Sequence, residues 1–156
     1  MEKPKPHARA LRIGRYSEPN RIYVVTAVTR NRAPLFIDLV LGRIVVNALR
    51  KEHLADRATT LAYVVMPDHF HWLLQLGSKA TLSHVVRAVK GSTARSINLA
   101  VGGLERIWQP GFHDHAVRRE EDLAGIACYI VANPLRAGLA EDIRMYSLWD
   151  SLWMGE

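Results

Sequence analysis

The chain has 156 residues, of which 49% are hydrophobic and 23% charged, a composition that suits one globular domain and excludes disordered, collagen-like and coiled-coil chains. No apolar run approaches the roughly 18–20 residues of a membrane helix, and the first twenty residues lack the apolar stretch of a secretory signal. Cys128 is the only cysteine, so we expect a cytoplasmic protein without an internal disulfide. The net charge of +6 is typical of a protein with a nucleic-acid partner.

Predicted strands and helices alternate along the first half of the chain. Residues 22–29 are β-branched and apolar, which predicts a strand buried on both faces. Residues 38–53 carry an apolar stripe at helical spacing and predict a helix. Two further strands, 59–65 and 69–76, flank the turn signal Met66-Pro67-Asp68 and are expected to pair antiparallel.

The second half continues the pattern. A helix is predicted over 82–100 and should end at Gly102-Gly103. Residues 106–117 can supply another strand, and a third helix is predicted over 120–133, with Pro134 ending it. The order β-α-β-β-α-β-α predicts an α+β fold of the ferredoxin-like or RRM-like kind, an antiparallel sheet with helices packed on it.

Basic residues gather in two zones. Residues 1–20 form a basic N-terminal arm, and residues 21–156 are expected to form a single domain. The second zone has no carboxylate between positions 68 and 105 and contains four cations: Lys79, Arg87, Lys90 and Arg95. Such acid-poor stretches indicate contact with a phosphate backbone, although a merely solvated helix face has the same composition.

The segment Met66-Pro67-Asp68-His69-Phe70-His71-Trp72 begins a predicted strand with a His-x-His pair. Because strand side chains alternate, His69 and His71 should point to one face and form half of a site for a divalent ion. Two histidines that are simply exposed on a strand would give the same pattern. A second pair, His113-Asp114-His115, could equally be a ligand pair, and spacing alone does not choose between them.

The first histidine segment resembles the HUH motif, two histidines around a hydrophobic residue, of single-tyrosine nucleases. More narrowly, the chain resembles the REP-associated tyrosine transposases, relatives of the small insertion-sequence tyrosine transposases. The resemblance runs in order through about residues 9–153. The matching motifs are Leu11-Arg12, Gly14-Arg15, Pro34-Leu35-Phe36, Trp108-Gln109, Asp114-His115 followed by Arg118, Tyr129 with Asn133-Pro134, and Ala137-Gly138-Leu139.

The resemblance implies that Tyr129 is the catalytic nucleophile. On a helix, Tyr129 and Asn133 would be stacked one turn apart, along the edge of an apolar stripe formed by Leu123, Ile126, Ala127 and Ile130. A helix of this kind can lie on the sheet and present a phenol and an amide to a site there. Without the histidines, Tyr129 would more simply be a border aromatic and Asn133 a residue that ends a helix. Cys128 has no basic neighbour in the sequence and is expected to be a packed thiol.

The implied chemistry is the nicking and rejoining of single-stranded DNA through a 5′-phosphotyrosine. In the family pattern His69, His71 and Asn133 hold Mg²⁺ or Mn²⁺, and Zn²⁺ is not excluded by ligand type. Asp114 and His115 match a family position. They could border the site, or Asp114 could orient a histidine through a hydrogen bond.

The resemblance also implies the partner, single-stranded DNA hairpins of the REP palindrome type with an adjacent guide sequence. Arg12 and Arg15 are candidates for guide contacts. The remaining candidates for DNA contacts are Arg87, Lys90, Arg95 and Arg118. A monomer is favoured over a dimer, and no membrane is expected to be involved.

Three alternatives remain at the level of sequence. The chain could be a hairpin-binding module of the same fold without catalysis, or an RNA-binding domain of similar fold. A mononuclear metallo-hydrolase without a covalent intermediate is the third. Formation of a protein–DNA adduct separates the proposed enzyme from all three.

Overall fold

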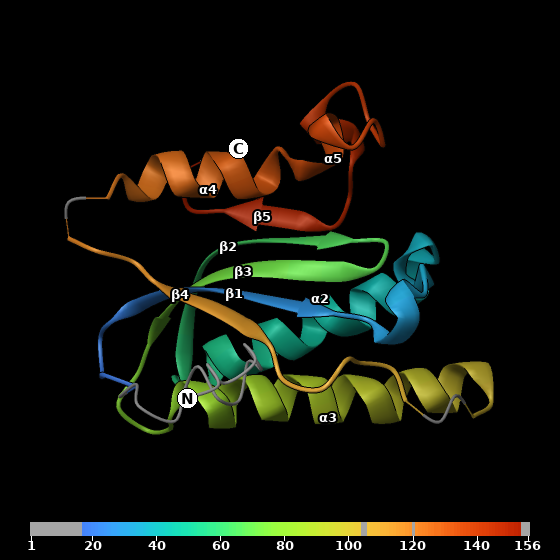
Figure 1. Ribbon diagram of the computed structural model, residues 1–156, viewed down its shortest axis with the longest axis horizontal. Coiled ribbons are helices and arrows are strands. Elements are labelled where there is room, and N and C mark those ends of the chain that lie inside the picture. The colour runs from blue at the N-terminus through green and yellow to red at the C-terminus, as the bar shows by residue number, and fades with distance from the viewer. Residues whose placement is uncertain (1–16, 104–105, 120, 154–156) are drawn as a thin grey trace, which may run out of the picture.

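The computed structural model describes residues 17–103, 106–119 and 121–153, so Arg12, Arg15 and most of the expected basic arm lie outside the described residues. The described strands form one antiparallel sheet in the order β4-β1-β3-β2-β5 (Figure 1). Their bounds are β1 Ile22–Val28, β2 Ala58–Met66, β3 His69–Leu76, β4 His113–Ala116 and β5 Trp149–Ser151. The predicted α+β fold with helices on an antiparallel sheet is therefore confirmed.

Two edge strands differ from the prediction. The segment expected over 106–117 supplies only the four residues of β4, and before it Trp108 makes an isolated bridge to Thr29. Pro110 and Gly111 separate these two pieces, because proline cannot donate to a ladder and Gly111 has a φ of +72°. At the opposite edge, β5 pairs with β2 and was not predicted, since three residues carry too little periodicity.

The two long helices follow the predicted bounds closely. Helix α2 (Leu39–Leu54) begins at Asp38, whose side chain accepts from the Val40 amide at 2.9 Å. Helix α3 (Leu82–Val101) begins at Thr81 and ends at Gly102 with φ +83°. Short 3₁₀ turns at Arg30–Arg32, Leu35–Ile37 and Ile143–Met145 complete the connections.

The third predicted helix, 120–133, requires a correction. Helix α4 covers Leu123–Val131, and a second short helix, α5 (Asn133–Arg136), follows immediately. Pro134 does not end the helical path. It lies in the first turn of α5, where a missing backbone N–H costs little because first-turn N–H groups lack helical partners anyway.

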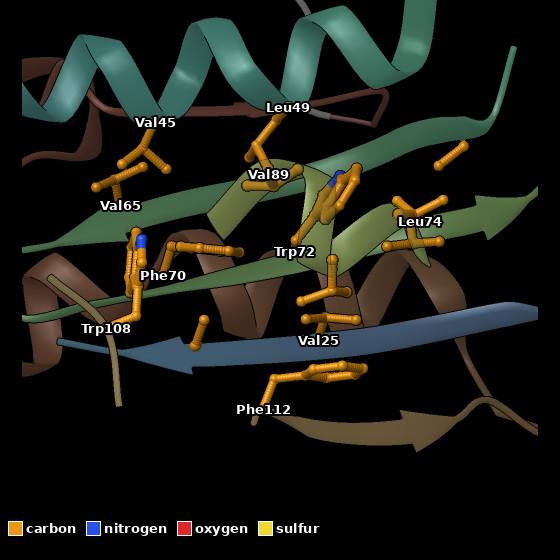
Figure 2. Close-up of a cluster of buried hydrophobic side chains, with 14 of the residues drawn as sticks. Val25, Val45, Leu49, Val65, Phe70, Trp72, Leu74, Val89, Trp108 and Phe112 are labelled. Atoms are coloured by element: carbon orange, nitrogen blue, oxygen red, sulfur yellow. The ribbon is translucent and has the colours of Figure 1, made fainter. Parts of the chain in front are cut away.

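The helices divide between the two faces of the sheet (Figure 1). Helices α2 and α3 cover one face, whose core includes Phe70, Trp72 and Leu74 of β3 (Figure 2). Helix α4 covers part of the other face and packs against Leu73 and neighbouring residues of β2. Within the described ranges, no helix combines the length and apolarity needed to cross a membrane.

Candidate active site

Strand β3 presents both histidines of the first pair on the face that α4 covers. His71 lies opposite Thr26 of β1 and Val64 of β2, and His69 lies opposite Val28 and Met66. The intervening Phe70 is fully buried in the core on the α2–α3 side. The alternation predicted from the sequence is confirmed.

The two imidazoles are held with one nitrogen each turned toward the protein. Their ring centroids are 4.8 Å apart with an interplanar angle of 77°. His71 Nδ1 lies 2.7 Å from Thr26 Oγ1, and His69 Nδ1 lies 2.6 Å from Asp68 Oδ1. These contacts leave both Nε2 atoms without a hydrogen-bond partner among the described residues. Fixing one ring nitrogen so that the other can bind a ligand is the usual arrangement around metal-binding histidines.

The electrostatic environment keeps His71 neutral. Burial lowers the pKa of His71 to about 4, and the nearby charges of His69 and Arg136 add to this effect. A neutral imidazole at pH 7 is the form that binds a metal ion. Burial alone would raise the pKa of Asp68. The hydrogen bonds and charges of His69 and Arg32 outweigh burial and hold the Asp68 pKa below its ordinary value.

Asp68 links His69 to a third residue. Arg32 Nη1 lies 3.3 Å from Asp68 Oδ2, while the other carboxylate oxygen holds His69. Arg32 follows β1 and Asp68 precedes β3, so this chain of contacts ties together the ends of two neighbouring strands. The orientation of His69 therefore depends on the loop after β1.

Tyr129 lies on α4 with 66% of its surface exposed, beside the helix face that enters the core. That core face includes Ala127 and Ile130, as the apolar stripe predicted. The neighbouring Cys128 is exposed, which corrects the expectation of a packed thiol. An exposed phenol next to a buried helix face is accessible to a substrate while its backbone is fixed.

Asn133 begins α5 and does not continue α4, so the expected stacking on one uninterrupted helix is not observed. Its Nδ2 donates to the carbonyl oxygen of Ile130 at 2.9 Å. In a continuous helix this carbonyl would accept from the backbone N–H of residue 134, which proline lacks. The Asn133 amide nitrogen replaces that donor. Its Oδ1 accepts no hydrogen bond from the described residues.

Arg136, which sequence reasoning missed, contacts Tyr129 twice. Its guanidinium carbon lies 3.8 Å from the centroid of the Tyr129 ring, and Nη2 donates to the Tyr129 carbonyl oxygen at 2.6 Å. The same charge contributes to the lowered pKa of His71. The spacing of seven residues, two helical turns, is the one sequence signal that could have suggested a contact with Tyr129.

The other predicted cations are dispersed. Arg87 and Arg95 are exposed on α3, on the opposite side of the sheet from the histidines. Lys90 is half-buried, and its Nζ donates to the carbonyl oxygens of Gln109 at 2.7 Å and Gly111 at 2.5 Å. Its charge holds the loop before β4 against α3, so Lys90 is less available for the predicted DNA contact than Arg87 and Arg95 are.

The second histidine pair lies on β4, at the edge of the sheet. His115 is opposite Val24 and Asp114 opposite Val25, so they point to different faces. The carboxylate beside His115 belongs to Glu121, whose Oε1 lies 3.1 Å from Nε2. Asp114 therefore does not orient His115, and β1 separates this strand from the histidines of β3.

Arg118 is exposed at the rim of a cleft between the start of β1 and the start of α4. The cleft has a volume of about 700 Å³ and is also lined by Arg21, Arg119, Ile22 and Leu123. The Arg118 backbone N–H donates to Glu121 Oε1 at 3.0 Å.

Comparisons with known proteins identify the family and the fold. The family described as "Transposase IS200 like" matches residues 18–133, which include both histidines, Tyr129 and Asn133. A REP-associated tyrosine transposase of Escherichia coli K12 is 33% identical over 84 residues, 53% of this chain and 47% of that protein. A Haemophilus influenzae protein assigned to the same group is 28% identical over 96 residues, 54% of each chain. The chain thus spans about half the length of the curated relatives it matches.

A solved structure shares the fold. It is described as the REP-associated tyrosine transposase bound to a REP hairpin and matches with a TM-score of 0.73 at 23% identity, over 96% of this chain and 82% of that one.

Proposed function

Because this chain belongs to the IS200-like transposase family, we propose that it nicks and rejoins single-stranded DNA through a covalent bond between Tyr129 and a 5′-phosphate. One observation carries the proposal. Helix α4, which carries the exposed Tyr129, packs on the sheet face that presents the two histidines, and both histidines have available Nε2 atoms.

The residues fit a divalent ion. Within the described ranges no three His, Cys, Asp or Glu side chains cluster, so a ligand set beyond His69 and His71 requires another donor. Asn133 Oδ1 has the right chemistry, since its amide nitrogen is already committed to Ile130. Imidazole nitrogens with amide and substrate oxygens suit Mg²⁺ or Mn²⁺, and Zn²⁺ is compatible with the same donors. When bound, such an ion would polarise a non-bridging oxygen of the scissile phosphate.

The chain's own residues supply the remaining chemistry. Tyr129 Oη attacks phosphorus and forms the new O–P bond, losing its proton, while the bond to the 3′-oxygen breaks. The departing 3′-oxygen takes up a proton and leaves as a hydroxyl. Attack by a second 3′-hydroxyl on the phosphotyrosine reverses these steps and releases Tyr129. One phosphodiester replaces another, so the reaction needs no external energy source.

The proposed substrates are REP-type palindromes folded as hairpins, as the similarity to REP-associated transposases suggests. Arg118 lies at a cleft beside the start of β1, whereas His71 and His69 pair with Thr26 and Val28 towards the end of that strand. Arg118 would therefore contact DNA at a distance from the histidines. Arg87 and Arg95 lie on α3, on the other side of the sheet from the histidines, so they would contact only DNA that extends around the protein to that side. Binding through these cations should weaken steeply with salt. We propose that a monomer acts, in the cytoplasm.

The test is adduct formation on end-labelled single-stranded palindromic oligonucleotides with flanks on both sides. Wild-type protein and Tyr129→Phe are incubated with Mn²⁺, Mg²⁺ or EDTA, and products are separated on denaturing gels. We expect a covalent protein–DNA band that requires both the metal and Tyr129. The Tyr129→Phe protein should bind the hairpin with unchanged affinity, because only the hydroxyl is removed.

Two other results would replace the proposal. Specific hairpin binding without an adduct, across several palindromes and metals, would indicate a binding module. Cleavage without an adduct would indicate a metallo-hydrolase. Matched RNA hairpins in competition show whether the partner is RNA instead.

A further inference from the structure

We propose that Arg136 is a positioning residue that holds the Tyr129 ring in the orientation required for attack. This inference rests on the function proposed above. Two contacts with one residue support it: the guanidinium lies over the ring at 3.8 Å, and Nη2 donates to the carbonyl oxygen of the same tyrosine at 2.6 Å. Arg136 thus fixes the backbone and the side chain of Tyr129 relative to each other.

The exposure of Tyr129 explains why such a clamp is needed. With 66% of its surface exposed, the ring has few packing neighbours to fix its rotamer. An exposed aromatic side chain samples several rotamers on the nanosecond scale, and most of them point the hydroxyl away from any one phosphate. A planar cation against the ring restricts these rotamers without covering the hydroxyl.

The junction between α4 and α5 creates the contact. Pro134 cannot donate to the Ile130 carbonyl as residue 134 of a continuous helix would, and Asn133 Nδ2 donates to that carbonyl instead, beside the Ala132 N–H. The next turn then carries Arg136 at the end of α5, from where its side chain folds back to Tyr129. The residue that begins α5 is the proposed metal ligand Asn133. One short helix therefore sets the position of the nucleophile and of a ligand.

Arginine is suited to this role in a way that lysine is not. A guanidinium can lie flat on a ring and donate from its edge to a carbonyl at the same time. An ammonium group can make either contact, but not both in this geometry. The Arg136→Lys variant therefore keeps the charge near His71 and loses the clamp.

The experiment compares Arg136→Gln and Arg136→Lys with Arg144→Gln. Arg144 is a matched control because it is an exposed arginine (85%) that pairs only with the neighbouring Asp142 among the described residues. Single-turnover adduct formation and hairpin affinity over a salt series are measured for each protein, using the palindromic oligonucleotide cleaved by the wild type. Thermal melting shows that each variant is folded.

We expect both Arg136 variants to form the adduct roughly ten- to a hundredfold more slowly, since small misplacement of a reacting group has effects of this size. Hairpin affinity and its salt dependence should stay as in the wild type, and Arg144→Gln should change neither. An unchanged rate in Arg136→Gln overturns the proposal. A loss of hairpin affinity would also overturn it if the slope of log affinity against log salt became smaller by about 0.7. That change would identify Arg136 as a contact with one phosphate of the single strand.

A second measurement tests the contact between Arg136 and Tyr129 without requiring the proposed reaction to occur. With 3-fluorotyrosine at position 129, the fluorine resonance reports ring motion without DNA or metal. We expect a broader line in the wild type and Arg144→Gln than in Arg136→Gln, whose ring is released. Equal line widths overturn the clamp. A wild-type protein that forms no adduct, yet shows the difference in line width, would contradict the proposed function and leave the clamp supported.

Discussion

The two faces of the sheet differ in how completely they are covered, although the same strands build both. On one face, two helices of 16 and 20 residues seal a core in which Phe70, Trp72 and Leu74 of β3 are 0% exposed. On the other, α4 has only nine residues and packs against β2 and β5, so the histidine end of β3 is left partly open. Alternation along a single strand thus separates residues that stabilise the fold from residues that can bind a ligand.

The partly open face is not simply a solvated one. Burial is the main cause of the low pKa of His71, and hydrogen bonds fix both imidazoles at Nδ1. An exposed pair of histidines would be charged more readily and would rotate. The comparison therefore predicts separable effects. Mutations on the partly open face should change metal-dependent chemistry, and mutations on the sealed face should change the free energy of unfolding.

The largest expected effect belongs to the partly open face. His71→Gln removes one imidazole donor, and we expect metal-dependent adduct formation to fall by a factor on the order of a thousand, because a metal contributes several kcal/mol to such a reaction. Isothermal titration with Mn²⁺ should show weakened binding in parallel. Gln75→Ala, four residues along the same face of β3, is the matched control and should keep both properties. Normal adduct formation by His71→Gln would remove this histidine from the site.

On the sealed face, Trp72→Ala tests stability. Trp72 is fully buried and its Nε1 donates to Thr60 Oγ1 at 3.0 Å, so truncation leaves a large cavity and a hydroxyl without its partner. We expect the free energy of unfolding to fall by about 3–5 kcal/mol in urea titrations. Leu54→Ala, an exposed apolar residue, should change it by less than about 0.5 kcal/mol.

The Trp72→Ala variant also tests whether the two faces are independent. Under conditions where Trp72→Ala is folded, its affinity for Mn²⁺ should equal that of the wild type, although Trp72 is adjacent to His71 in the chain. A parallel loss of metal affinity would mean that packing on the sealed face sets the geometry of the histidines. The two faces would then be one cooperative unit.

A smaller effect is expected from Thr26→Val, which keeps the shape of the side chain and removes the hydroxyl that holds His71 Nδ1 at 2.7 Å. Residues that orient metal-binding histidines typically contribute about ten- to a hundredfold in metal affinity. The Mn²⁺ titration should weaken by that factor while hairpin binding without metal is retained. If the affinity is unchanged, a contact other than Thr26 orients His71.

Sequence patterns predicted the periodic parts of this molecule and missed the parts that depend on tertiary contacts. Alternation placed His69 and His71 on one face, and apolar stripes gave α2 and α3 nearly residue by residue. These features repeat over several turns or residue pairs, so the signal accumulates along the sequence.

The missed features rest on individual contacts that have no periodic signal in the sequence. Pro134 was expected to end a helix because the sequence does not reveal that Asn133 supplies the missing donor to Ile130. Lys90 was assigned to DNA because charge alone does not reveal the two carbonyl oxygens that it holds. Arg136 was overlooked because its contact with Tyr129 needs the turn between α4 and α5.

The smallest expected effect concerns alkaline pH and a tyrosine on the sealed side. Tyr63 of β2 packs against the core under α2 and α3, and burial, aided by Asp150, raises its pKa to about 12 against the opposing charges of Arg43 and Arg50. Between pH 10 and 12 the unfolded chain loses this proton while the folded chain keeps it. The folded state then binds more protons, so the free energy of unfolding falls as pH rises.

Tyr63→Phe removes the contribution of Tyr63 to that slope. Urea titrations from pH 8 to pH 12 should give parallel curves for wild type and variant below pH 10, and a shallower decline for the variant above it. Some decline should persist, because burial also raises the pKa of Tyr146. Metal binding near neutral pH should be the same in both proteins, since Tyr63 lies on the opposite side of the sheet from His71. An identical decline above pH 10 would show that Tyr63 is solvated in the folded state and that the sealed face is more open than its packing indicates.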